Sequence, residues 1–233
     1  MDISQSTLVT QAETEARRFI HMVYGWMCAG LAVSGACSFY MVSDPRMIAN
    51  FVRTPVLMWG LMIAELGLVF VLAGMISRMS ASTAKFAFLF YAALTGVSLS
   101  PIFLVYTTGS IAGVFFMTAG LFGALCLYGY TTKTDLTSVG NFAFMALIGL
   151  IIASVVNWFL HSAALQWIMS YAGILIFTAL TAYDAQKIKA MYNPAEDGTE
   201  NETKEAILGA LALYLDFINL FIQLLQLFGN RRD

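Results

Sequence analysis

Seven long apolar runs occupy most of this chain of 233 residues. Each run has about the 20 residues that an α-helix needs to cross the roughly 30 Å hydrocarbon core of a bilayer. The alternation of apolar and polar residues typical of membrane β-barrels is absent. The sequence therefore predicts an all-α, polytopic membrane protein, with a seven-helix domain at residues 19–228 between short tails at residues 1–18 and 229–233. The predicted spans are Phe19–Val42, Val56–Ser77, Ala84–Thr107, Gly109–Tyr130, Val139–Leu160, Leu165–Met191 and Ala206–Phe228.

The composition supports the membrane assignment and excludes several other classes of protein. Hydrophobic residues make up 59% of the chain and charged residues 11%, against about 25% charged residues in soluble domains. No basic patch is present, so nucleic acid is not an expected partner. The three cysteines are odd in number and lack a Cys-x-x-Cys spacing, which argues against both a disulfide framework and a zinc site.

The orientation in the membrane follows from the basic residues in the short links. Eight of the twelve Lys and Arg residues fall on the side of the N-terminus and four on the other side. We therefore expect the N-terminus in the cytoplasm and the C-terminus outside.

Ionisable residues inside the spans are all acidic. The twelve basic residues lie outside the spans or at their edges, whereas three of the fourteen acids, Glu65, Asp184 and Asp216, lie within them. An ionised Asp near the bilayer centre costs at least about 2.5–3.5 kcal/mol, and the spans offer no obvious fixed counter-charge. Each acid must therefore be protonated, share a proton, bind a cation or borrow a base from a helix end.

Asp216 belongs to a polar stripe on the last predicted helix. The stripe has spacings of four, four, three, four and three residues, which place its members on one helical face. Such a face must contact protein or water rather than lipid, so we expect the last helix to be central in the bundle. The stripe consists of Gly209, Ala212, Asp216, Asn219, Gln223 and Gln226.

Asp184 and Asp216 are predicted to face each other. They lie on consecutive, antiparallel helices, and counting from the predicted helix ends puts their depths within about 4–5 Å of each other at 1.5 Å per residue. Two carboxyls in a low dielectric do not both ionise readily, so their proton release is coupled. Such a pair can sense pH, and its oxygen atoms are ligands that suit calcium. The alternative is that each Asp simply joins neighbouring helices by a hydrogen bond.

Six residues besides the acidic pair have weaker predicted roles. Arg78 ends the second span on the same side as the acidic pair, where it can either latch the pair or extend to the headgroups. Glu65 and Tyr183 are supporting polar residues, as Asn219 and Gln223 are on the last helix. Pro101 should kink the third span and is a candidate hinge.

Two local patterns carry further expectations. Gly113, Gly120 and Gly123 in the fourth span predict close helix packing. The acidic segment Asn193–Glu205 contains Pro194 and Gly198 and is predicted to be a solvated, mobile link, because it lacks the ligand pattern of a calcium-binding EF-hand loop.

Three segments resemble motifs of the Bax-inhibitor family. Leu213–Ile222 resembles its last-helix signature, Tyr183–Ile188 its sixth-helix motif and Thr95–Pro101 its third-helix element. The resemblance covers nearly the whole chain and is strongest to bacterial inner-membrane members. It implies a seven-helix bundle with the last helix central and a calcium leak gated by protons. It also implies that Asp184 and Asp216 sense pH and that a second-helix arginine, to which Arg78 is the nearest match, latches them.

These observations favour a pH-sensitive cation leak, with calcium and protons as the ions and the bilayer as the surroundings. On this hypothesis the protein is not an enzyme and has no cofactor, because calcium is the transported or bound ion. One alternative is a non-transporting regulator of a membrane protease or channel. A remote alternative is an intramembrane aspartyl protease, but such enzymes carry Gly-x-Gly-Asp where this chain has Leu213-Tyr214-Leu215-Asp216.

Overall fold

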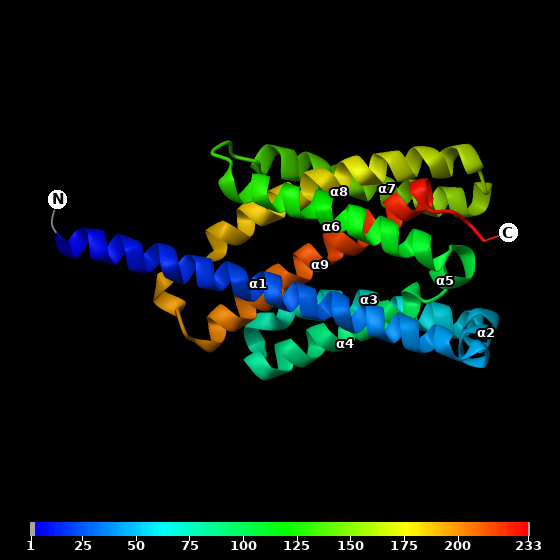
Figure 1. Ribbon diagram of the computed structural model, residues 1–233, viewed down its shortest axis with the longest axis horizontal. Helices are drawn as coiled ribbons and strands as arrows, with labels where there is room; N and C mark the ends of the chain where they lie inside the picture. Colours follow the sequence, from blue (N-terminus) through cyan, green and yellow to red (C-terminus); the bar gives the residue numbers. More distant parts are fainter. Residues whose placement is uncertain (1–2, 233) are drawn as a thin grey trace. The chain divides into compact units, whose positions relative to one another are not determined.

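The computed structural model describes residues 3–232, with side chains from Thr14 onward, and these residues fold as a series of helices (Figure 1). Seven helical segments are long and apolar enough to cross a membrane, and each coincides with one predicted span. The all-α polytopic fold is therefore confirmed. The elements are α1 (Ile3–Ser43), α2 (Pro45–Arg53), α3 (Pro55–Met75), the 3-10 turn η1 (Ile76–Arg78), α4 (Ala81–Leu99), α5 (Ile102–Val105), α6 (Thr108–Thr131), α7 (Thr137–Leu160), α8 (Ala163–Met191), the 3-10 turn η2 (Pro194–Glu196) and α9 (Glu200–Phe228).

Two proline residues shape the links between the helices. The helix that begins at one of them was not predicted from the sequence, whereas the break at the other was. Pro45 opens the nine-residue helix α2, whose first turn is capped by the Asp44 side chain, in a link that was not expected to be helical. Proline at the first helical position fits because its missing N–H needs no partner there. Pro101 separates α4 from α5, so the predicted break in the third span is present.

The chain divides into two compact units, which are described one at a time. Unit one comprises residues 3–102 and 191–214, and unit two comprises residues from Phe103 to Ala190 and from Leu215 onward. Helix α9 contributes its first half to unit one and its second half to unit two. It is the most buried span: 61% of its apolar stretch is buried, compared with 6–33% in the other six. This burial agrees with the prediction of an interior last helix.

Unit one is held together by close contacts between α1 and α4. The Ser34 hydroxyl lies 2.6 Å from both the carbonyl oxygen of Ala92 and the hydroxyl of Tyr214. Gly96 allows this approach, because a Cβ at that position would lie 2.4 Å from the carbonyl oxygen of Ser34. The buried ring of Tyr214 then packs edge-on against Phe88 at 5.9 Å. Helix α9 is thus anchored to α1 and α4 just before Asp216.

In unit two, α6 and α8 pack against the second half of α9, and α7 packs against α8. The Phe217 ring lies 5.4 Å from the rings of Phe115 and Phe122 on α6, in edge-on geometry. This aromatic contact covers one side of α9 next to Asp216. Large apolar side chains cover much of the outward surface of α7, as expected of a helix that faces lipid.

The segment before α9 is largely exposed, as the sequence predicted, but it is not wholly a solvated link. Helix α9 begins at Glu200, so the later part of that segment is helical. Glu202 is 4% exposed, and its carboxylate accepts hydrogen bonds from the N–H of Gly198, at 2.8 Å, and from Arg18 on α1. The Thr199 hydroxyl accepts the N–H of Glu202 at 3.4 Å, so the two side chains form a variant of the capping box. Glu202 can therefore be buried, although the segment is acidic, because the helix cap and Arg18 satisfy its carboxylate.

Removing the Glu202 carboxylate is expected to destabilise the start of α9. Glu202→Ala should lower the free energy of unfolding by about 1–2 kcal/mol, the usual size of a lost helix cap. Glu200→Ala is the matched control, because Glu200 lies in the same turn with an exposed side chain. Thermal unfolding in detergent, followed by circular dichroism, measures both. Equal losses in the two variants would contradict the capping role.

Candidate functional site

The carboxyl groups of Asp184 on α8 and Asp216 on α9 lie together in unit two. The two side chains are close enough to interact directly. Asp216 is 5% exposed, whereas Asp184 is only partly buried. A hydrogen bond between two carboxyls requires a proton on one of them, because carboxylates only accept. Two adjacent carboxyls of this kind can therefore be joined by one shared proton.

The part of the polar stripe that lies in unit two faces α8. Beyond Asp216, the Gln223 side chain packs against Gly173, where a Cβ would lie 2.7 Å from the amide carbon. One turn further, the carbonyl oxygen of Gln226 accepts a hydrogen bond from the Ser170 hydroxyl at 2.8 Å. Residues later in α9 thus contact residues earlier in α8, which is the pattern expected of antiparallel helices.

Two oxygen atoms on this interface lack hydrogen-bond partners within the described chain. They are Oδ2 of Asp216 and Oε1 of Gln223, and both are fully buried. The residues are seven positions apart, so their side chains lie two turns apart on one face of α9. Asn219, between them, donates to the carbonyl oxygen of Leu215 in its own helix at 2.8 Å. Buried polar atoms are normally paired with protein, water or an ion, so this line of acceptors suits a water molecule or a cation.

One positive charge lies close to the acidic pair, which corrects the expectation that the spans hold no counter-charge. Lys187 follows Asp184 by three residues, nearly one helical turn, and attracts its carboxylate electrostatically. Its ammonium nitrogen also lies 5.9 Å from the centre of the Tyr183 ring. Lys187 is exposed, so it can balance charge at Asp184 more readily than at the buried Asp216. The spacing of three residues between Asp184 and Lys187 is visible in the sequence, so this contact could have been predicted.

Two glycines fix the position of α8 around Asp184. On α7, a Cβ at Gly140 would fall 2.4 Å from the ring of Tyr183. On α6, a Cβ at Gly129 would fall 2.2 Å from the carbonyl oxygen of Ala182 and 3.0 Å from the Cβ of Ala185. The backbones of α6 and α7 therefore approach α8 on either side of Asp184, with no room for even a methyl group.

The residues after Asp184 hold the α6–α7 link. Gln186 accepts the N–H of Leu136 at 2.8 Å and donates to the carbonyl oxygen of Thr134 at 2.9 Å. Lys189 donates to the carbonyl oxygen of Tyr130 at 3.0 Å. Sequence reasoning assigned no role to Gln186 or Lys189, since their partners lie 50 or more residues away.

The other predicted site residues lie in unit one. Glu65 on α3 accepts a hydrogen bond from the Ser98 hydroxyl on α4, which agrees with a structural role between these helices. Arg78 ends η1 with its side chain exposed. The ion pairs found between described side chains are made by Arg18 and do not include Arg78. Its role as a latch stays a prediction, as does hinge motion at Pro101.

The acidic pair offers few ligands for a resident metal ion. Calcium usually takes six to eight oxygen ligands, and the two carboxyls provide four oxygen atoms. Among residues whose side chains are described, no three His, Cys, Asp or Glu residues gather where they could hold a metal. The chemistry that this arrangement supports directly is proton sharing and a weak, changeable attraction for cations.

Comparison with known proteins gives a consistent result along the chain. The family model described as inhibitor of apoptosis-promoting Bax1 matches residues 16–233. The inner membrane protein YbhL of Escherichia coli is 48% identical over 229 residues, which cover 98% of each chain. An uncharacterized protein of Rickettsia prowazekii is 44% identical over 93% of this chain and 91% of its own length. An uncharacterized membrane protein of Streptococcus pyogenes is 36% identical over 98% of this chain and 99% of its own.

Proposed function

This chain belongs to the family of inhibitors of apoptosis-promoting Bax1, and from that membership we propose that it is a pH-sensitive cation leak of the bacterial inner membrane, with calcium as the conducted ion. The observation that carries the proposal is the adjacency of Asp184 and Asp216 inside a helical membrane protein. Intramembrane acids of this kind mark ion or proton pathways more often than they serve as structural contacts.

The pair couples proton binding to cation attraction. With a shared proton it carries at most one negative charge, and with two protons it carries none. Loss of protons leaves more charge in a low-dielectric setting, where attraction for a divalent cation is strong. The unpartnered oxygens of Asp216 and Gln223 extend this acceptor surface along α9. A cation that keeps part of its water shell can be attracted there without a complete protein coordination shell.

Calcium flux into liposomes tests the proposal. With purified protein and a trapped calcium indicator, we expect flux to rise between pH 6 and pH 8 as the pair loses protons. In Asp216→Asn the flux should be severalfold lower at pH 8 and nearly independent of pH, because the amide carries no charge and cannot share a proton with Asp184. Protein-free liposomes provide the baseline. Equal flux in the original protein and the variant at every pH would rule the proposal out.

The same preparation separates the two alternative functions. A regulator of a membrane protease or channel would give no flux above protein-free liposomes and would co-purify with a membrane partner. An intramembrane protease would cleave a helical reporter and lose that activity in Asp184→Ala. The bulky, buried Leu213 and Tyr214 before Asp216 leave little space for a substrate backbone there, which disfavours the protease.

The proposed orientation places the N-terminus in the cytoplasm and the C-terminus outside, from the excess of basic residues on the N-terminal side. Reporter fusions that are active on only one side of the membrane test it. A fusion at the C-terminus should be active only outside.

A further inference from the structure

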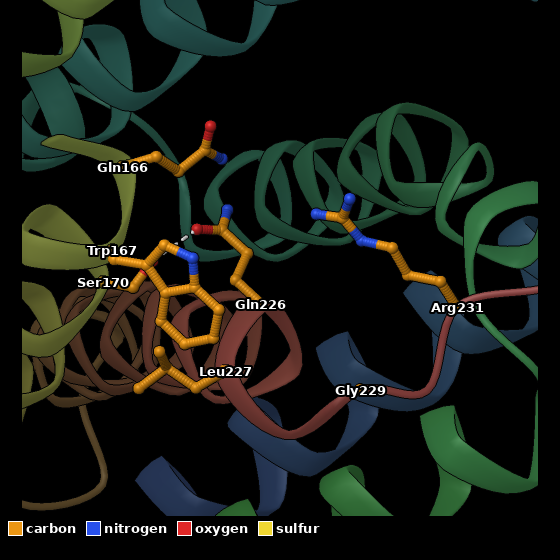
Figure 2. A pocket seen from close by; sticks show the side chains of 7 residues that line it. All are labelled: Gln166, Trp167, Ser170, Gln226, Leu227, Gly229 and Arg231. Carbon is orange, nitrogen blue, oxygen red and sulfur yellow. Dashed lines mark hydrogen bonds between the residues drawn. The ribbon is translucent and has the colours of Figure 1, made fainter. Parts of the chain in front are cut away.

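A cavity in unit two, at the far end of the α8–α9 interface from the acidic pair, has no part in the proposed leak. It has a volume of about 230 Å³ and lies where α8 begins and α9 ends. Its polar lining comes from Gln166 and Ser170 on α8, Gln226 on α9 and Arg231 beyond α9, and Trp167 forms one wall. Figure 2 shows the guanidinium of Arg231 pointing toward the amide groups of Gln166 and Gln226.

Arg231 is held in place by backbone hydrogen bonds. The residues after α9 pair with the α5–α6 link through an isolated β-bridge between Arg231 and Tyr106. On one side of the bridge the N–H of Thr107 donates to Asn230 at 3.1 Å, and on the other the N–H of Arg232 donates to Val105 at 2.8 Å. The short tail predicted at residues 229–233 is therefore fixed as far as residue 232, and the base of the Arg231 side chain is fixed with it.

Within the described residues, the cavity is a cationic site without an acidic partner. No Asp or Glu lines it, and Arg231 takes no part in the ion pairs between described side chains. Besides the guanidinium, the Gln166 amide and the indole N–H of Trp167 can donate hydrogen bonds. The Gln226 carbonyl oxygen is already engaged by Ser170. These are the features of an anion site.

Its position along the helices matches the headgroup region of a bilayer. The exposed aromatic side chains Trp158, Trp167 and Tyr171 lie near the ends of α7 and α8 at this end of unit two. Trp and Tyr are enriched at that level of membrane proteins. Phospholipid phosphates lie at the same level, so a phosphate group is the anion that an embedded protein meets there in quantity.

We propose that this cavity binds a phosphate group through Arg231, Gln166 and Trp167. The guanidinium presents paired N–H donors that match two phosphate oxygens, and the neighbouring amide and indole supply further donors. The volume is below the roughly 300–1,000 Å³ of pockets for drug-sized ligands, so it fits a single headgroup moiety or a free anion. Acyl chains of a lipid bound there would extend along the apolar outer face of α8.

Paired arginine variants test the site. Purified protein in detergent is titrated with phosphatidylglycerol or with inorganic phosphate, and binding is followed by native mass spectrometry and by the rise in unfolding temperature. We expect Arg231→Gln to weaken binding about tenfold, the effect of losing a charge-assisted hydrogen bond. Arg232→Gln should bind as the original protein does, since Arg232 carries the same charge next to the cavity without lining it.

The two probes distinguish the source of the phosphate. Saturable binding of phosphatidylglycerol alone identifies a lipid headgroup, and binding of inorganic phosphate as well identifies a site for the free anion. Gln166→Leu is a second variant that leaves the backbone bridge intact and should also weaken binding. Equal binding in Arg231→Gln and Arg232→Gln, or no saturable binding of either probe, would overturn the proposal. The binding experiment does not measure calcium flux, so its failure can be distinguished from failure of the proposed cation leak.

Discussion

Replacing both Asp184 and Asp216 by Asn is expected to remove the pH dependence of calcium flux no more completely than either single replacement does. The two carboxyls are adjacent, so a proton on one changes the charge state of the other. Each single variant removes the partner with which the remaining acid shares a proton, so the coupled titration between pH 6 and pH 8 is lost. The ratio of flux at pH 8 to flux at pH 6 should therefore fall to near one in all three variants.

The size of this non-additivity measures the coupling within the pair. Residues in one hydrogen-bond network show interaction energies of about 0.5–3 kcal/mol, so the double variant can differ about tenfold from the product of the single effects. The contrary result is equally clear. If each single variant keeps about half of the pH dependence and the double variant loses all of it, the two acids titrate independently and do not share a proton.

Asp135→Asn is the control for this experiment. Asp135 lies in the link between α6 and α7, outside the spans, where the Thr137 hydroxyl and N–H donate to its carboxylate. These hydrogen bonds lower the pKa of Asp135. The group therefore stays ionised throughout pH 6–8, and its replacement should leave the pH dependence of flux unchanged.

The sequence predicted the features that depend on one helix at a time. The seven spans follow from hydrophobic length alone, and the face of α9 that carries Asp216 and Gln223 follows from helical periodicity. The proximity of Asp184 and Asp216 needed one further step of reasoning. Two residues at similar depths on consecutive antiparallel helices lie at the same level of the bundle and can face each other. These inferences use only geometry within a helix or between consecutive helices.

Features that depend on distant partners were missed or wrongly predicted. Glu202 resembles the other acids of its segment, yet the cap at Thr199 and the ion pair with Arg18 bury it. Gly113, Gly120 and Gly123 resemble packing positions on α6, but the space where their side chains would stand is open, and the close contact is at Gly129. A glycine facing lipid and a glycine facing a helix cannot be told apart without the neighbouring backbone.

Replacing the closely packed Gly129 is expected to cause the largest change in stability, whereas replacing the exposed Gly123 is not. Gly129→Leu should lower the free energy of unfolding by about 3 kcal/mol, the upper end of the range for overpacking. The obstruction is the backbone of α8 at Ala182, which no side-chain rotation can relieve. Gly123→Leu should be nearly neutral, because Gly123 is exposed on the same helix and a lipid-facing leucine costs little. Unfolding by added SDS in mixed micelles measures both, and equal stability of the two variants would contradict the packing of α6 on α8.

A smaller replacement at the same position links this packing to the acidic pair. Ala182 and Ala185, which touch the Gly129 position, lie on either side of Asp184. In Gly129→Ala the extra methyl group pushes α8 away from α6 at that level, and the close contact of the two carboxyls should loosen with it. We expect Gly129→Ala to remain folded but to show a weaker pH dependence of flux than Gly123→Ala. If the two alanine variants share the same pH dependence while differing in stability, the position of α8 matters for folding but not for proton sharing between Asp184 and Asp216.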